Sequence, residues 1–118
     1  MQTHKDLDVW KLGIELVKDV YLFCESFPGN ERFGLASQMQ RAAVSIPSNI
    51  AEGSARKGKN ELIQFLYVAQ GSLAELETQV IIALEVRLVP SDGGLLQKIE
   101  LLRRKLINYT KYVKEHYV

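Results

Sequence analysis

The sequence predicts an all-α protein, an antiparallel up-down-up-down four-helix bundle. Apolar residues recur at alternating spacings of three and four through four successive segments, and this spacing places them on one face of a helix. The segments are separated by short stretches containing proline or glycine, and short connections favour antiparallel neighbours. With 118 residues, of which 47% are hydrophobic and 25% charged, the chain predicts a single domain spanning residues 1–118.

The first helix is expected near residues 5–27. Two neighbouring apolar rows run along it: Leu7, Trp10, Ile14, Val17, Tyr21 and Cys24 in one, and Val9, Gly13, Leu16, Val20, Phe23 and Phe27 in the other. Together the rows predict a wide apolar face. The helix should end at "FPGNE", because Pro28 disfavours helix at the residue before it and Gly29 suits a turn.

The second helix is expected near residues 31–56. Its apolar row is Leu35, Met39, Ala42 and Ile46, continuing through Asn49 to Gly53, and its polar stripe is Gln38, Arg41, Ser45, Ser48, Glu52 and Arg56. Pro47 removes one backbone hydrogen bond and crowds the carbonyl group of Ala43, so the helix should bend between these residues. The stretch "RKGKNE" predicts a break at Gly58, with the next helix starting at Lys59 or Asn60.

The third and fourth helices are expected near residues 60–88 and 92–116. The third has the clearest row: Leu62, Leu66, Ala69, Leu73, Leu76, Val80 and Ala83. After "VPSDGG", Ser91 or Asp92 is expected to cap the fourth helix, because serine and aspartate are preferred at that position. Its apolar row is Leu95, Ile99, Leu102, Leu106, Tyr109 and Val113.

Composition argues against several classes of function. Cys24 is the only cysteine, which excludes an intramolecular disulfide, and His4 and His116 are far apart, so neither a metal nor another cofactor is expected. The apolar runs are too short to span a bilayer, and the N-terminus lacks the apolar core of a signal peptide. A cytoplasmic protein without a membrane partner is the expectation.

The stretch "SIPSNIAEGSARKGKNE" allows two interpretations, a functional site or a packing device. As a packing device it is a kinked helix closed by a structural polar network, to which we assign Arg41, Ser45, Ser48, Asn49, Glu52, Glu75 and Glu77. As an enzyme site it lacks a histidine near its serines, a carboxylate partner for Glu52, and the residue order of a phosphate-binding loop. No catalytic residue is therefore predicted.

The segments "FGLASQMQRAAVSIPSNIAEGSARKG" and "FLYVAQGSLAELETQ" resemble the four-helix bundle family encoded by intervening sequences within bacterial 23S ribosomal RNA genes. The resemblance extends from Leu7 and Trp10 to Glu77, and in the last third only the helical pattern agrees. It implies a ring-like homopentamer, an association with nucleic acid and no enzymatic activity. A related accessory protein of diversity-generating retroelements is a pentameric bundle that works with RNA.

Charge and apolar surface suggest two functions. The net charge is only +1, but residues 96–118 carry +4. The first hypothesis is an oligomer that binds RNA through phosphate contacts, and ribosomal RNA is one candidate for that RNA. The expected contact residues are Arg56, Lys57 and Lys59 at one bundle end and Arg103, Arg104, Lys105, Lys111 and Lys114 on the last helix, which is taken as the principal surface. Tyr109, Tyr112 and Tyr117 lie among them and are suited to stacking on bases.

The second hypothesis is a homo-oligomeric scaffold without nucleic-acid contact. Apolar residues in the first and third helices exceed what one core stripe needs, and surplus apolar surface indicates a subunit interface. The residues assigned to this surplus are Val9, Leu12, Leu16, Leu22 and Phe23, and Ile63, Tyr67, Ile81 and Ile82. A measurement of RNA binding separates the two hypotheses.

Overall fold

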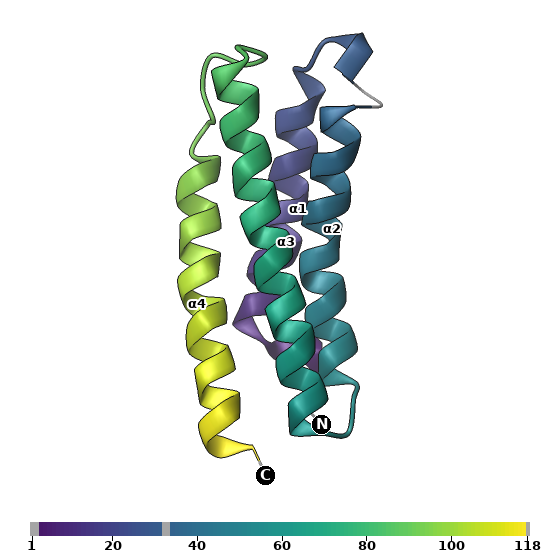
Figure 1. The fold of residues 1–118 in the computed structure, drawn as a ribbon, viewed down its shortest axis with the longest axis vertical. Helices are drawn as coiled ribbons and strands as arrows, with labels where there is room; N and C mark the ends of the chain where they lie inside the picture. Colours follow the sequence, from purple (N-terminus) through teal and green to yellow (C-terminus); the bar gives the residue numbers. More distant parts are fainter. Residues whose placement is uncertain (1–2, 32–33, 118) are drawn as a thin grey trace.

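A computed structural model describes residues 3–31 and 34–117 as an all-α bundle that contains no strand within these residues. Its long helices are α1 (Asp8–Glu25), α2 (Leu35–Ser54), α3 (Lys59–Glu85) and α4 (Leu95–His116). Figure 1 shows each helix running opposite to the one before it, with both chain ends at the same end of the bundle. Each helix packs against the two beside it, α1 and α3 both contacting α2 and α4. The predicted fold class is confirmed.

The N-terminal segment folds as two helices where one was expected. A 3-10 helix, η1 (His4–Asp6), is closed by reciprocal hydrogen bonds of Thr3 and Asp6, and α1 follows after Leu7. The end of α1 agrees with the expected stop before Pro28, because Ser26 is its C-cap.

The two apolar rows of α1 are not equally buried. Val9 and Leu16 are only 4% and 3% exposed, whereas Ile14 and Tyr21 are 37% and 47% exposed. The interpretation of Val9 and Leu16 as surplus interface surface is therefore wrong. The row that contains Gly13 faces the core, because this glycine allows α1 to approach Pro47 of α2: a Cβ atom at Gly13 would lie 3.3 Å from the Pro47 Cβ.

Helix α2 begins at Leu35, later than the predicted start near residue 31. A short 3-10 helix, η2 (Gly29–Glu31), precedes it, and residues 32–33 lie outside the described part of the chain. The helix runs through Pro47 without interruption. The predicted apolar row is confirmed, since Met39, Ala42 and Ile46 are all buried. The bend at Pro47 stays a prediction.

Helix α3 confirms the clearest sequence pattern. All seven residues of its predicted row are at most 4% exposed. It starts at Lys59 after Gly58, as expected, and ends before the predicted residue 88 because the chain turns at Arg87, which has a φ of 61°. The N–H group of Leu88 donates to the Ala83 carbonyl oxygen at 2.9 Å and that of Arg87 to Leu84 at 3.1 Å, the pattern of a Schellman cap.

Helix α4 starts three residues later than expected, at Leu95, because Gly93 and Gly94 have positive φ values of 61° and 87°. The predicted cap is partly confirmed: the Asp92 carboxylate accepts hydrogen bonds from the N–H groups of Gly94 at 3.2 Å and Leu96 at 3.1 Å. The N-cap residue itself is Gly94. The predicted apolar row joins α1, α2 and α3 in one core.

Candidate nucleic-acid interface

The unusual stretch of α2 is a packing device on two sides. Toward α1, Pro47 packs on Gly13. Toward α3, the Asn49 amide donates to the Ser45 carbonyl oxygen at 2.7 Å and to its hydroxyl at 2.9 Å, and that hydroxyl is 2.9 Å from the hydroxyl of Ser72. The NH2 group of the half-buried Asn49 amide thus has two acceptors, and the contact between the two serine hydroxyls joins α2 to α3. No part of it is arranged as a nucleophile and base.

The predicted polar network is only partly brought together. Ser45 and Asn49 are joined as described, Glu52 pairs with Arg56, and Glu77 pairs with Arg103. The remaining members are exposed, and within the described residues no hydrogen bond or ion pair joins their side chains to another side chain: Arg41, Ser48 and Glu75. Separate contacts therefore replace a single network within one chain.

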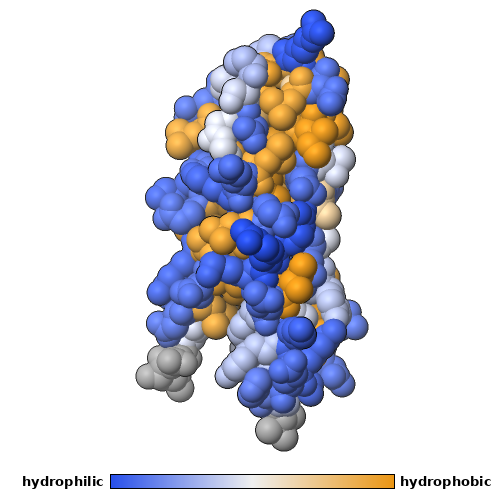
Figure 2. All heavy atoms as spheres, turned by 90° about the vertical axis from the view of Figure 1, so that its left-hand side faces the viewer, coloured by the Kyte–Doolittle hydropathy of each residue, from blue (hydrophilic) through white to orange (hydrophobic). Residues whose placement is uncertain are grey.

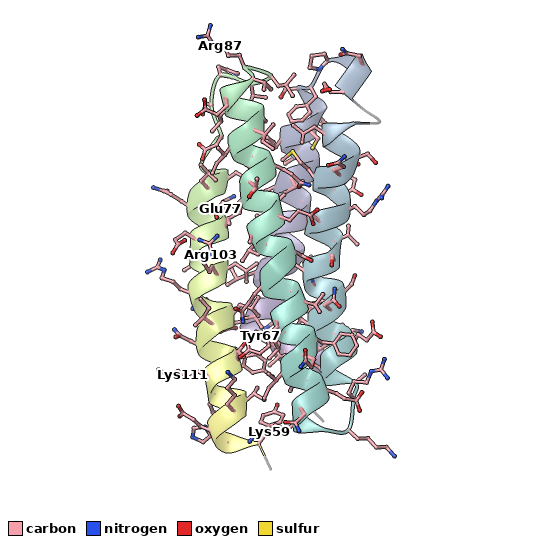
Figure 3. The ribbon with its side chains drawn as sticks, viewed as in Figure 1. Lys59, Tyr67, Glu77, Arg87, Arg103 and Lys111 are labelled. Atoms are coloured by element: carbon pink, nitrogen blue, oxygen red, sulfur yellow. The ribbon has the colours of Figure 1, made fainter. Side chains whose placement is uncertain are left out.

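Arg103 is held by two carboxylates. Figure 3 labels it on α4, with one of them, Glu77, on the neighbouring helix α3. Its guanidinium donates to Glu77 of α3 at 2.6 Å and to Glu100 one turn earlier on α4. The hydrogen bond with Glu77 is the main cause of the raised pKa of Arg103, and burial opposes it. These contacts tie α4 to α3 and compete with a phosphate for the same N–H groups.

Replacing Glu77 with glutamine should lower the free energy of unfolding by about 1 kcal/mol, since its ion pair with Arg103 is only about one third exposed. The Glu77 and Arg103 side chains are 33% and 27% exposed. Glu52→Gln is the matched control: Glu52 and Arg56 are 53% and 45% exposed, so the expected loss is below about 0.5 kcal/mol. Urea denaturation measures the free energy of unfolding of both variants. Equal losses would contradict the larger contribution expected of the Glu77–Arg103 pair.

Two other predicted contact residues also have partners. Arg56 is 2.8 Å from Glu52 and 3.8 Å from Glu61, and its guanidinium lies over the ring of Phe65. Lys114 donates to the hydroxyl of Tyr67. The other five have no ion pair within the described residues: Lys57, Lys59, Arg104, Lys105 and Lys111. In Figure 3, Lys111 points away from the bundle and Lys59 lies at its lower end.

The fold gathers positive charge at the end that carries the chain termini. Residues 3–11, 52–64 and 105–117, which we name the basic end, contain eight Lys/Arg and five Asp/Glu, whereas the other described residues contain six and nine. The eight cations are Lys5, Lys11, Arg56, Lys57, Lys59, Lys105, Lys111 and Lys114. A nearly neutral chain therefore has one positive end and a negative remainder.

A hollow of about 290 Å³ opens in the basic end. Its wall comes from four separate parts of the chain: the N-terminal segment, the turn between α2 and α3, the first turn of α3, and the last turns of α4. The hydroxyl groups of Tyr109 and Tyr117 are 3.4 Å apart at its edge. Sequence reasoning found these tyrosines and Lys57 but not Thr3, His4 or Ser54, which no periodicity singles out.

Exposed apolar residues lie mainly away from the basic end. Leu22 of α1 is 63% exposed and Leu101 of α4 is 39% exposed. A shallow groove between these helices includes Leu12 and Leu101 and is bordered by the ion pair of Lys98 with Asp19, 2.8 Å long. Figure 2 shows the hydrophobic surface broadest in the upper half of this face and the lower end largely hydrophilic.

The bundle and its basic end define the class of protein: a small four-helix protein whose positive charge is concentrated at one end. Comparison with protein families then identifies the family to which the chain belongs. The family model for the 23S rRNA-intervening sequence protein matches residues 5–108, and the chain belongs to this family. That description names no enzymatic role. No curated protein matches the chain.

Two negative findings apply to residues 3–31 and 34–117. None of their helices has the length and apolar character needed to cross a membrane. No three of their His, Cys, Asp or Glu side chains are grouped as a metal site would require.

Proposed function

We propose that the protein is a non-enzymatic, homo-oligomeric protein of the cytoplasm that binds RNA through its basic end. The observation that carries the proposal is the separation of charge along the bundle. The basic end contains eight Lys/Arg and five Asp/Glu, although the whole chain has a net charge of only +1. RNA phosphates are attracted to such a surface and released from it by salt.

The side chains at this end have different roles in the proposed contact. Lys57, Lys59 and Lys111 contact phosphates, because they have no carboxylate partner within the described residues. Tyr112 and Tyr117 are 51% and 43% exposed and supply faces on which bases stack. Arg103 stays with Glu77 and Glu100 and makes no phosphate contact.

Assembly strengthens this weak surface. Each chain contributes a small excess of positive charge, and a ring of several copies, five as the family resemblance implies, presents it repeatedly to one RNA. The exposed apolar side chains of α1, α3 and α4 supply the contact surface between copies, among them Leu22, Ile81 and Ile107. If RNA is not bound, this apolar surface favours the second function, a homo-oligomeric scaffold.

The proposal is tested by fluorescence anisotropy with a labelled single-stranded RNA over a range of salt concentrations. We expect the logarithm of the association constant to fall linearly with the logarithm of salt concentration. The triple variant Lys57→Ser, Lys59→Ser, Lys111→Ser should bind at least about tenfold more weakly and give a flatter slope.

The matched control is Lys18→Ser, Arg41→Ser, Arg87→Ser, which removes the same charge outside the basic end. It should change the affinity less than about twofold. Equal losses in the two triple variants would refute the placement of the site. Absence of binding by the wild type at low salt would refute RNA binding and leave the scaffold function, which sedimentation velocity then tests through the oligomeric state.

A further inference from the structure

The hollow in the basic end is a concave site lined by both cationic and aromatic side chains. Its volume of about 290 Å³ lies near the lower limit for small-ligand sites. Two leucines, Leu7 and Leu62, line it with apolar surface. Its position depends on the complete fold, because these leucines come from segments far apart in sequence.

The polar groups of the hollow favour an anion. Arg56 and Lys57 line it, and no aspartate or glutamate does. Arg56 is oriented by its ion pairs with Glu52 and Glu61, which lie outside the lining, whereas Lys57 is exposed and has no ion pair within the described residues. A ligand with negative charge therefore gains Lys57 as a new partner without displacing an internal carboxylate from it.

The turn at Gly58 adds backbone donors to these side chains. Gly58 lines the hollow and is the N-cap of α3, and it provides no side-chain cap. The first N–H groups of a helix have no partner within the helix, and they bind phosphate together with neighbouring cations. The cations and the helix start thus lie on the same side of the hollow.

The tyrosines give the hollow a second chemical character. Tyr117 is 43% exposed at its rim, and its hydroxyl lies 3.4 Å from that of Tyr109. Burial and this hydrogen bond raise the pKa of Tyr109. An aromatic rim above leucine side chains accommodates a planar, weakly polar group such as a nucleobase.

We propose that this hollow binds a phosphorylated nucleoside, with the phosphate at Lys57 and the start of α3 and the base against Leu7 and Tyr117. The source of this ligand is either the phosphate-bearing terminal nucleotide of an RNA or a free mononucleotide. The first source rests on the proposed function and deepens it: the protein then recognises an RNA end in addition to the phosphate backbone.

The test compares one short single-stranded RNA in three forms, with a 5′-phosphate, with a 3′-phosphate and with hydroxyl groups at both ends, and uses AMP as a competitor. We expect one phosphorylated form to bind about tenfold more tightly than the hydroxyl form, as a charge-assisted contact predicts. AMP should compete with it. Lys57→Ser should reduce this preference, and Tyr117→Ser, which removes the aromatic face offered to the base, should weaken the competition by AMP.

Lys111→Ser is the matched control, because it removes one lysine of the basic end that does not line the hollow. It should weaken all three RNAs equally and keep the preference. If all three RNAs bind equally and AMP does not compete, the inference is overturned while the proposed function stands.

If no RNA binds but AMP binds to the wild type and not to the Lys57→Ser variant, the inference holds for a free mononucleotide and the proposed function fails. Failure of both AMP and RNA to bind overturns both.

Discussion

Replacing Gly53 with alanine should lower the free energy of unfolding by about 1–3 kcal/mol, although alanine is the better helix former. Gly53 is buried near the end of α2, where α2 and α3 are in close contact. A Cβ atom there would lie 2.7 Å from the Cβ of Phe65 and 3.1 Å from a methyl group of Leu62. The Cβ of Phe65 is attached directly to the backbone, so α3 itself must move to accept the methyl group.

Gly71→Ala is the matched control for this variant. Gly71 also lies inside a helix, but it is exposed and a Cβ atom there would meet nothing within 4 Å. This change should stabilise the protein by up to about 1 kcal/mol through helix propensity alone. Urea denaturation at equal protein concentrations measures both variants, since assembly affects apparent stability. A Gly53→Ala variant as stable as the wild type would contradict the close contact of α2 with α3.

Replacing Gln79 with leucine should raise the free energy of unfolding by about 1–2 kcal/mol. Gln79 is only 5% exposed on α3, and its side-chain oxygen Oε1 has no hydrogen-bond partner within the described residues. Burial of an unpaired amide oxygen costs free energy, and leucine of similar size removes that cost while keeping the space filled.

Gln70→Leu makes the same chemical change on the same helix at a position where the amide is paired. The Gln70 amide donates at 3.0 Å to the hydroxyl of Thr110, which in turn donates at 2.8 Å to the Leu106 carbonyl oxygen. Leucine at position 70 should therefore be neutral or destabilising by about 1 kcal/mol. Thermal unfolding followed by circular dichroism compares the two, and a stabilising Gln70→Leu with a destabilising Gln79→Leu would reverse this interpretation.

Sequence periodicity predicted α3 and α4 better than α1. The apolar row of α3 continues without a break from Leu62 to Ala83, and all of it is buried. In α1 two apolar rows compete, and the choice between them depends on the partner helix. The row that contains Gly13 faces the core because this glycine allows close packing against Pro47. The two residues are 34 positions apart in the sequence, so no local pattern contains their contact.

The candidate site was predictable only as a set of residue types. Lysines in the turn after α2 and tyrosines near the end of α4 indicate a nucleic-acid surface from sequence alone. Their convergence on one hollow requires the topology, and the assignment of Arg103 requires its contacts with Glu77 and Glu100. Charge totals along the chain cannot distinguish a lysine in solvent from an arginine held by two carboxylates.

The shared position of the chain ends has a practical consequence for experiments. Because four helices alternate in direction, Thr3 and Tyr117 both lie beside the hollow at the basic end. A polyhistidine tag or fluorescent fusion joined at either terminus would add its own charge and bulk at the place where binding is to be measured. A label attached in the loop between α3 and α4, for example at Ser91, lies at the opposite end and leaves that surface unobstructed.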